Sequence, residues 1–206
     1  MKLSIDNATE VCKILAMTLT APQPDRQDAI LDAAFSAFAA YGYRRTTMED
    51  IAHNAGLSRT ALYQHFRSKE DIVRSLTVRH FGQTAVAMEA ALNIPGQSTE
   101  QALYACFVAK DGKIMDVAMS SRHGAELLDA SHSVSSDVVR AGNARAADVL
   151  ASWIETRGFP PEMGSATSLA SIIMAALYGL KSTSRTLAEF RAGEAQLATL
   201  IARALG

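Results

Sequence analysis

Apolar residues recur along the chain at the spacing of a helix, and no segment of useful length alternates apolar and polar residues as a half-buried strand does. Ile30, Ala34 and Phe38 form one such series, and Leu197 and Ile201 belong to another near the end of the sequence. Pro, Gly and Ser residues separate the apolar segments. The pattern predicts an all-α protein without internal repeats.

The same punctuation sets the expected helix boundaries. Gly42 and Gly56 each follow an apolar segment, as glycine often does just past a helix C-terminus. The first expected helix spans about 25–41. The next three begin at caps: Thr46 or Thr47 for a helix that ends at Gly56, Ser58 for one that ends near Phe66, and Ser68 for one that runs to about Leu92. The later helices are expected over about 99–120, 121–130, 135–157 and 161–183, followed by a last helix that carries Leu197 to Leu205. The break between the last two lies within 182–193, and residues 1–20 are an extension of undetermined order.

Composition and charge exclude some classes of protein. The chain has 206 residues, 49% of them apolar, which suits one domain or two small ones with a real core. A net charge of −1 excludes a globally basic nucleic-acid binder, so any DNA-binding argument must rest on local charge. Cys12 and Cys106 form no CxxC pair, so we expect a cytoplasmic protein with inert thiols. The most apolar stretch, 169–180, is too short for a membrane span, and no membrane partner is expected.

Residues 46–66, TTMEDIAHNAGLSRTALYQHF, have the features of a helix-turn-helix. Ala52 is a small residue where the two helices cross, and Gly56 gives the turn its backbone freedom. The residues expected to face inward are Ile51, Ala55, Leu57, Leu62 and Phe66. The residues expected on the outer face of the second helix are Ser58, Arg59, Thr60, Tyr63 and Gln64, a set that suits a recognition helix in the major groove.

Local charge supports a DNA contact at this segment. Seven Lys or Arg residues and four Asp or Glu residues lie between positions 44 and 79, which gives a local net charge of +3. Arg44 and Arg45 are expected to contact the DNA backbone by their charge alone. Lys69 and Thr47 stand at helix N-termini, where free backbone N–H groups favour a phosphate.

Residues 42–72, GYRRTTMEDIAHNAGLSRTALYQHFRSKEDI, resemble the N-terminal domain of the TetR family of transcriptional regulators, and with the preceding helix the resemblance covers about 25–80. The matching features are Gly42-Tyr43, Thr46-Thr47, Ile51-Ala52, Ala55-Gly56-Leu57-Ser58, Leu62-Tyr63, His65-Phe66 and Ser68-Lys69-Glu70. The resemblance implies a three-helix DNA-binding head over 21–68 after the extension 1–20. It also implies a connector helix and a helical ligand-binding and dimerisation domain over 69–206. It implies DNA contacts at Thr47, Arg59, Thr60, Tyr63, Gln64, His65 and Lys69; local capping or packing is the alternative for His65.

The resemblance further implies a homodimer, a near-palindromic operator in double-stranded DNA and a small effector. Met and aromatic side chains in the second half suit an adaptable apolar pocket, although such residues are individually more often core. The candidate effector residues are Tyr104, Phe107, Met115, Met119, His123, Leu127, Trp153, Met174 and Tyr178. The candidate dimer residues are Ile172, Ile173, Ala176, Leu177, Leu180, Leu197, Leu200 and Ile201, for which packing within the chain is the alternative.

Two other kinds of site find no support. The spacing of His123, Glu126, Asp129 and His132 makes the two histidines point to opposite sides of a helix. Because metal ligands must converge, no metal is expected. No nucleophile, base and orienting group share a motif, so neither a catalytic site nor a cofactor is expected. The sequence predicts a dimeric DNA-binding transcriptional regulator, a repressor released by a small, largely apolar effector. The alternatives are the same head controlled without a small molecule, an α-helical enzyme, and a helical module that binds protein.

Overall fold

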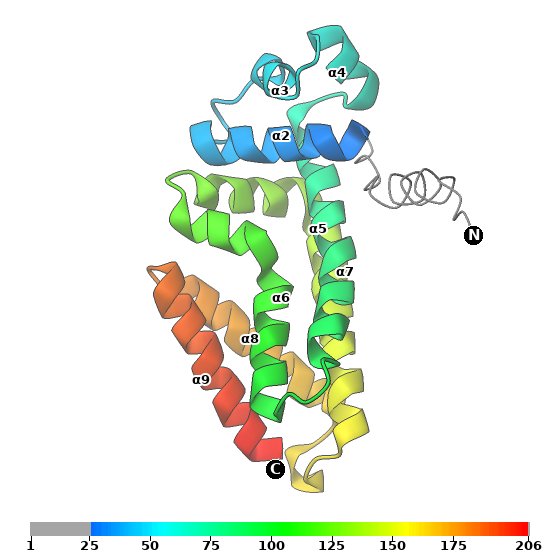
Figure 1. Cartoon of the computed structure of the whole chain (residues 1–206), viewed down its shortest axis with the longest axis vertical. Coiled ribbons are helices and arrows are strands. Elements are labelled where there is room, and N and C mark those ends of the chain that lie inside the picture. The colour runs from blue at the N-terminus through cyan, green and yellow to red at the C-terminus, as the bar shows by residue number, and fades with distance from the viewer. Residues whose placement is uncertain (1–25, 206) are drawn as a thin grey trace, which may run out of the picture.

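The computed structural model describes residues 26–205, the side chain of Lys113 excepted, and this part of the chain is built from helices (Figure 1). The predicted all-α class is confirmed, whereas the extension 1–20 lies outside the described residues. In chain order the elements are α2 (Arg26–Tyr41), α3 (Met48–Asn54), α4 (Arg59–His65), α5 (Lys69–Leu92), α6 (Thr99–Ser120), α7 (Gly124–Arg157), the 3-10 turn η1 (Pro161–Met163), α8 (Ala166–Thr183) and α9 (Leu187–Leu205).

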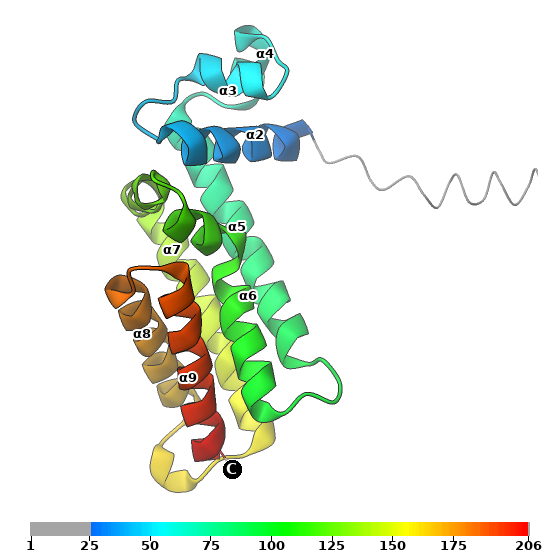
Figure 2. The same ribbon diagram turned by 60° about the vertical axis from the view of Figure 1, so that its left-hand side comes forward.

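Helices α2 to α4 form a head at one end of the molecule, and α5 to α9 form a longer body (Figures 1 and 2). The helix ends of the head follow from local sequence. Thr47 caps α3 in a capping box with Asp50, and Ser58 and Ser68 cap α4 and α5. Gly56 has a φ of 64° between α3 and α4, a conformation that residues with a Cβ rarely adopt. These predicted boundaries are confirmed.

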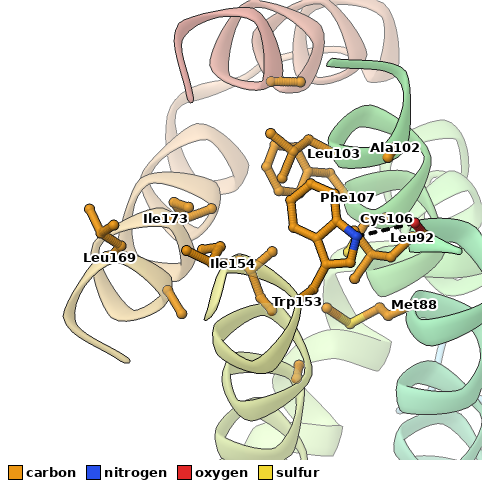
Figure 3. Packing of buried hydrophobic residues seen from close by; sticks show 14 of the residues in the cluster. Met88, Leu92, Ala102, Leu103, Cys106, Phe107, Trp153, Ile154, Leu169 and Ile173 are labelled. Carbon is orange, nitrogen blue, oxygen red and sulfur yellow. Dashed lines mark hydrogen bonds between the residues drawn. The ribbon is translucent and has the colours of Figure 1, made fainter. Parts of the chain in front are cut away.

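The body core lies among α5, α6, α7, α8 and α9, and Figure 3 shows part of its packing. Trp153 Nε1 donates a hydrogen bond to Leu92 O (3.2 Å), so the buried indole N–H has a partner. Cys106 is buried in the same cluster, and burial raises the pKa of its thiol to about 12, as suits an unreactive packing residue.

Two helices bend at defined residues. α6 leaves helical geometry at Gly112, where φ is 54°, and α7 does so at Ser135. The helices expected over 121–130 and 135–157 are therefore two arms of α7. The last part of α6 and the first arm of α7 lie beneath α2 and run across the long axis of the body (Figure 1).

The C-terminal helices differ from the expected boundaries at one point. α8 begins at Ala166 rather than near Pro161, because Gly164 (φ 89°) follows the short η1 turn and Ser165 caps the helix. The break before α9 falls at 184–186, inside the expected range. Among the described helices, none combines the length and apolarity that a membrane span needs.

Head and body share a core. Leu127 and Ala130 of α7 are buried in the cluster that also holds the head residues of α2, α3 and α4. Arg79 of α5 pairs with Asp28 (3.2 Å) and Asp32 (2.7 Å) of α2. Packing therefore continues across residue 68, where the sequence suggested a domain boundary.

Candidate nucleic-acid interface and ligand cavity

The corner between α3 and α4 is held by buried side chains and a backbone hydrogen bond. Leu57 N donates to Ala52 O (2.8 Å), which closes the turn at Gly56. Because its inward face is anchored in the head core, α4 presents its opposite face in a fixed orientation. Of the residues expected to face inward, Ile51, Leu62 and Phe66 are buried, and Ala55 and Leu57 are half-buried against the same cluster.

The outer face of α4 carries polar side chains. The Arg59 guanidinium carbon lies 5.6 Å from the centroid of the Tyr63 ring, within the range of a cation–π contact. Ser58 Oγ accepts a hydrogen bond from Ala61 N (3.1 Å), so this hydroxyl caps the helix. His65, the last residue of α4, is half-buried. The five residues expected on this face, Ser58, Arg59, Thr60, Tyr63 and Gln64, are all exposed.

The loop before α3 brings two more cations to the same end of the head. Arg44 and Arg45 are both exposed in this loop. Thr47 Oγ1 donates to Asp50 Oδ2 (2.7 Å) and accepts from Asp50 N (3.1 Å). The Asp50 carboxylate accepts from Thr47 Oγ1 and also from Thr47 N (2.8 Å), and these two hydrogen bonds lower its pKa. The Thr47 hydroxyl thus belongs to a capping box at the exposed helix start where a phosphate was expected.

Lys69 has partners that sequence reasoning did not foresee. Its Nζ donates to Tyr43 O (2.8 Å) and Arg44 O (3.4 Å), and it lies 4.8 Å from the centroid of the Tyr43 ring. Tyr43 Oη in turn donates to Glu70 Oε1 (3.0 Å). Burial, aided by this hydrogen bond, raises the pKa of Tyr43 to about 12. In this structure the Lys69 ammonium ties α5 to the arginine-bearing loop.

The local charge count includes cations that are paired within the chain. Arg74 Nη1 and Nη2 donate to Asp137 Oδ1 (2.8 Å) and Oδ2 (2.7 Å), which holds the pKa of that carboxyl well below its usual range. Arg79 is paired with Asp28 and Asp32 of α2. The local net charge of +3 therefore overstates the charge available to DNA, because acidic partners from outside residues 44–79 neutralise these two arginines.

A cavity of about 450 Å³ lies among α5, α6, α7 and α8, with Phe35 of α2 in its wall. Most of its lining side chains are apolar, as is usual for a small-molecule site. Met115, Leu127, Met174 and Tyr178, four of the nine candidate effector residues, line it. Tyr178 is 69% exposed, so it lines the rim.

The other five candidates, Tyr104, Phe107, Met119, His123 and Trp153, do not line this cavity. Phe107 and Trp153 belong to the body core, where their rings are packed against other buried side chains (Figure 3). Tyr104 is 36% exposed, and His123 stands just before α7. Met119, Tyr104 and His123 are absent from the cavity wall. Met and aromatic residues occur both in the cavity wall and in the core, so residue type alone could not tell cavity residues from core residues.

Sequence reasoning missed a polar cluster in the cavity wall, made of His80, Lys110, Asp111 and Lys181. Lys110 Nζ donates to Asp111 Oδ1 (3.2 Å). Burial lowers the pKa of His80 to about 4, so its imidazole is neutral near pH 7. Burial also lowers the pKa of Lys181; the carboxylate of Asp111 opposes this shift and the charge of Lys110 adds to it. The sequence signal for this cluster was the presence of charged residues within the apolar segments of α6 and α8.

The candidate dimer residues on α8 and α9 lie on different faces. Ile172 and Leu200 are 60% and 64% exposed. Ile173 and Leu177 are instead buried in the body core, so their assignment to an exposed interface is corrected to packing within the chain. Consecutive helix residues point about 100° apart, which explains why neighbours differ. The half-buried members of the set are Ala176, Leu180, Leu197 and Ile201.

Within residues 26–205, apart from the side chain of Lys113, no group of three His, Cys, Asp or Glu side chains is placed to hold a metal ion. His123 Nδ1 lies 3.7 Å from Glu126 Oε1, as a polar pair beside the head.

Comparison with known proteins relates the head to transcriptional regulators. Residues 30–76 match the bacterial regulatory proteins of the tetR family. The chain is 35% identical over 71 residues to the HTH-type transcriptional activator FasR of Mycolicibacterium smegmatis, a match that covers 34% of this chain and 32% of FasR. It is 43% identical over 58 residues to the HTH-type transcriptional repressor KstR2 of the same organism, 28% of each chain. The chain thus spans about a third or less of the length of these curated relatives.

The fold extends beyond the matched segment. The SmeT–triclosan complex, whose protein represses a Stenotrophomonas maltophilia efflux pump, has a TM-score of 0.58 and 20% sequence identity, and covers 86% of this chain and 89% of SmeT. Identity this low shows a shared fold alone.

Proposed function

We propose, from the membership of residues 30–76 in the TetR family of transcriptional regulators, that this DNA-binding regulator is a homodimeric repressor released from its operator by a small molecule. The observation that carries the proposal is the polar outer face of α4, on a helix whose inner residue Leu62 is fully buried. KstR2 and SmeT are named repressors and FasR is named an activator, so two of these three proteins support repression.

DNA recognition in this proposal divides into two sets of contacts. Residues on the exposed face of α4 read base edges in the major groove, where Arg, Thr, Gln and Tyr groups can pair with bases or the thymine methyl. Residues around the helix starts and ends contact the sugar-phosphate backbone and fix the register. The base-reading set is Arg59, Thr60, Tyr63 and Gln64. The backbone set is Arg44, Arg45, Thr47, Ser58 and His65, with Lys69 holding the loop that carries the two arginines.

The first arm of α7 couples the body to the head. Leu127 lines the cavity and is also buried in the head core. Arg44 N donates to Glu126 Oε2 (3.4 Å), which links the same arm to the DNA-contacting loop. A ligand that shifts this arm therefore shifts the head, residues 21–68, relative to the body, residues 69–206. Typical coupling energies of about 1–3 kcal/mol would weaken operator binding roughly 5- to 150-fold.

Dimerisation through α8 and α9 completes the proposal. Ile172 and Leu200 offer exposed apolar area, and Ala175 and Gly179 are exposed small residues on α8 that permit close approach of a second helix. Two copies related by a twofold axis would place two α4 helices in successive major grooves, about 34 Å apart, on a near-palindrome.

A head controlled without a small molecule is the alternative function. The cavity of about 450 Å³ favours the ligand-responsive version, since a fully packed body would leave no room for an effector. SmeT, which has this fold, forms a complex with triclosan, so a protein of this fold can take a small molecule.

Selection of random duplexes by the purified protein tests the proposed function. The wild type should enrich a near-palindrome, and rising salt should weaken its binding as phosphate contacts require. Tyr63→Ala should lose the enrichment, whereas Tyr104→Ala, the same change at an exposed body position, should keep it. No enrichment by the wild type at low salt, or equal enrichment by Tyr63→Ala, would contradict the assignment of α4 as the reading helix.

A further inference from the structure

The cavity wall is chemically uneven. Four polar side chains, His80, Lys110, Asp111 and Lys181, line the same cavity, and the charges of Lys110 and Asp111 act on the pKa of both His80 and Lys181. They come from α5, α6 and α8. Much of the remaining wall is apolar and includes Phe81, Met115, Val139, Ala144, Met174 and Leu177. A ligand that fills this space meets a mainly apolar surface, this polar cluster, and the further polar side chains of Thr77, Ser131, His132, Asn143 and Ser171.

The cluster carries an excess of positive charge. Lys110 and Asp111 neutralise each other, with Nζ and Oδ1 3.2 Å apart and side chains only 15% and 7% exposed. His80 is neutral near pH 7 because burial lowers its pKa to about 4. Lys181 takes part in none of the ion pairs found among the described residues. The cavity wall therefore holds two ammonium groups, Lys110 and Lys181, and one carboxylate, Asp111, which leaves an excess of one positive charge.

A neighbouring carboxylate does not supply the missing charge. Glu194 of α9 is fully buried near Asp111, but it is not part of the cavity wall. Its Oε2 accepts a hydrogen bond from Arg191 Nη1 (2.7 Å), and Arg191 Nη2 donates to Asp116 Oδ1 (2.7 Å). Burial also raises the pKa of Glu194 to about 7, so it is partly protonated at that pH. Arg191 holds Oε2 of Glu194, Oε1 has no hydrogen-bond partner among the described residues, and no ion pair joins this carboxylate to Lys181.

We infer that the cavity binds an amphipathic monoanion, with its apolar body against the wall of α5, α7 and α8 and a carboxylate or similar anionic head on Lys181. An ammonium held in a largely apolar wall loses hydration, and an anion that pairs with it restores the lost interaction. At roughly 30 Å³ for each water-sized group, the cavity holds about 15 such groups, which suits a medium-length aliphatic or bicyclic aromatic carboxylate. This inference rests on the proposed ligand-responsive function and names the chemistry of its effector.

Matched pairs of ligands that differ only in the head group test the inference by calorimetry. Decanoate is compared with decanol, and 2-naphthoate with 2-naphthol; decyltrimethylammonium serves as the cationic counterpart. Hydrogen bonds to charged groups contribute about 1.5–3 kcal/mol, so each anion should bind about tenfold or more tightly than its alcohol. Lys181→Met should remove this preference and leave the affinity for the alcohol unchanged. Arg185→Met, the same loss of charge at an exposed residue after α8, should keep it.

The outcomes separate the inference from the proposed function. Equal affinity for anion and alcohol, tighter binding of the cation, no binding of either anion, or an unchanged preference in Lys181→Met would overturn the inference. Lys181→Gln serves in place of Lys181→Met should the latter fail to fold. Operator release is measured on the same samples. Anion binding that depends on Lys181 but leaves DNA affinity unchanged would uphold the inference and contradict the proposed ligand response.

Discussion

Replacing Lys69 with Met removes the ammonium group that ties α5 to the loop before α3. In the wild type Nζ donates to Tyr43 O at 2.8 Å, and it donates a longer bond of 3.4 Å to Arg44 O. It also lies 4.8 Å from the centroid of the Tyr43 ring. Met keeps most of the aliphatic stem, so the substitution removes these polar contacts while conserving much of the packing volume.

The size of the effect follows from these contacts. A hydrogen bond from a charged donor contributes about 1.5–3 kcal/mol, and an exposed cation–π contact contributes about 0.5–1 kcal/mol. Because Lys69 is only half-buried, water partly replaces what is lost, and the long second bond adds little. We expect Lys69→Met to lower the free energy of unfolding by about 2 kcal/mol.

Urea unfolding in the absence of DNA measures this loss. Arg67→Met is the matched control, since Arg67 is an exposed cation two residues away, and it should change stability by less than about 0.5 kcal/mol. If Lys69→Met is as stable as the wild type, the ammonium group does not stabilise the contact between α5 and the loop before α3. The role predicted from the sequence, a direct phosphate contact, would then be preferred.

Three further changes test other parts of the structure. Trp153→Phe removes the indole N–H that donates to Leu92 O, so it should lower the free energy of unfolding by about 1–3 kcal/mol and leave ligand affinity unchanged. A changed ligand affinity in calorimetry would show that Trp153 contacts the effector. Burial raises the pKa of Glu194 from its ordinary value of 4.5 to about 7. Between these pH values the folded chain keeps a proton that the unfolded chain loses. The free energy of unfolding therefore falls as pH rises from 4.5 to 7, by up to roughly 3 kcal/mol. Glu194→Gln should flatten that decline in urea unfolding near pH 5 and pH 7, and an identical decline in both proteins would refute the shift. Ile172→Asp should convert dimers to monomers in sedimentation experiments, and an unchanged dimer would exclude the exposed face of α8 from the interface.

The head could be predicted closely because its signals are local. Thr47 and Ser58 cap helices through hydrogen bonds that span three residues, and Gly56 marks the turn between them. Lys69 shows where this approach ends. Its partners are backbone carbonyls 25 and 26 residues away, and no local pattern encodes them.

The cavity could be predicted only in part, because its position depends on how bent helices pack. α6 and α7 bend at Gly112 and Ser135, and a sequence does not show where such bends leave space. Trp153 and Met174 are both large, mainly apolar candidates, yet one is packed in the core and the other lines the cavity. Lys181 was not among the predicted residues, because an expected apolar pocket favours Met and aromatic side chains.

The most direct test compares the affinity of the wild-type protein for its selected duplex with its affinity for a scrambled duplex of the same composition, at one salt concentration. A sequence reader should prefer the selected duplex by about 10³-fold or more. Equal affinities would show that the exposed face of α4 does not read base sequence, and the helix-turn-helix would then have to serve a partner other than DNA.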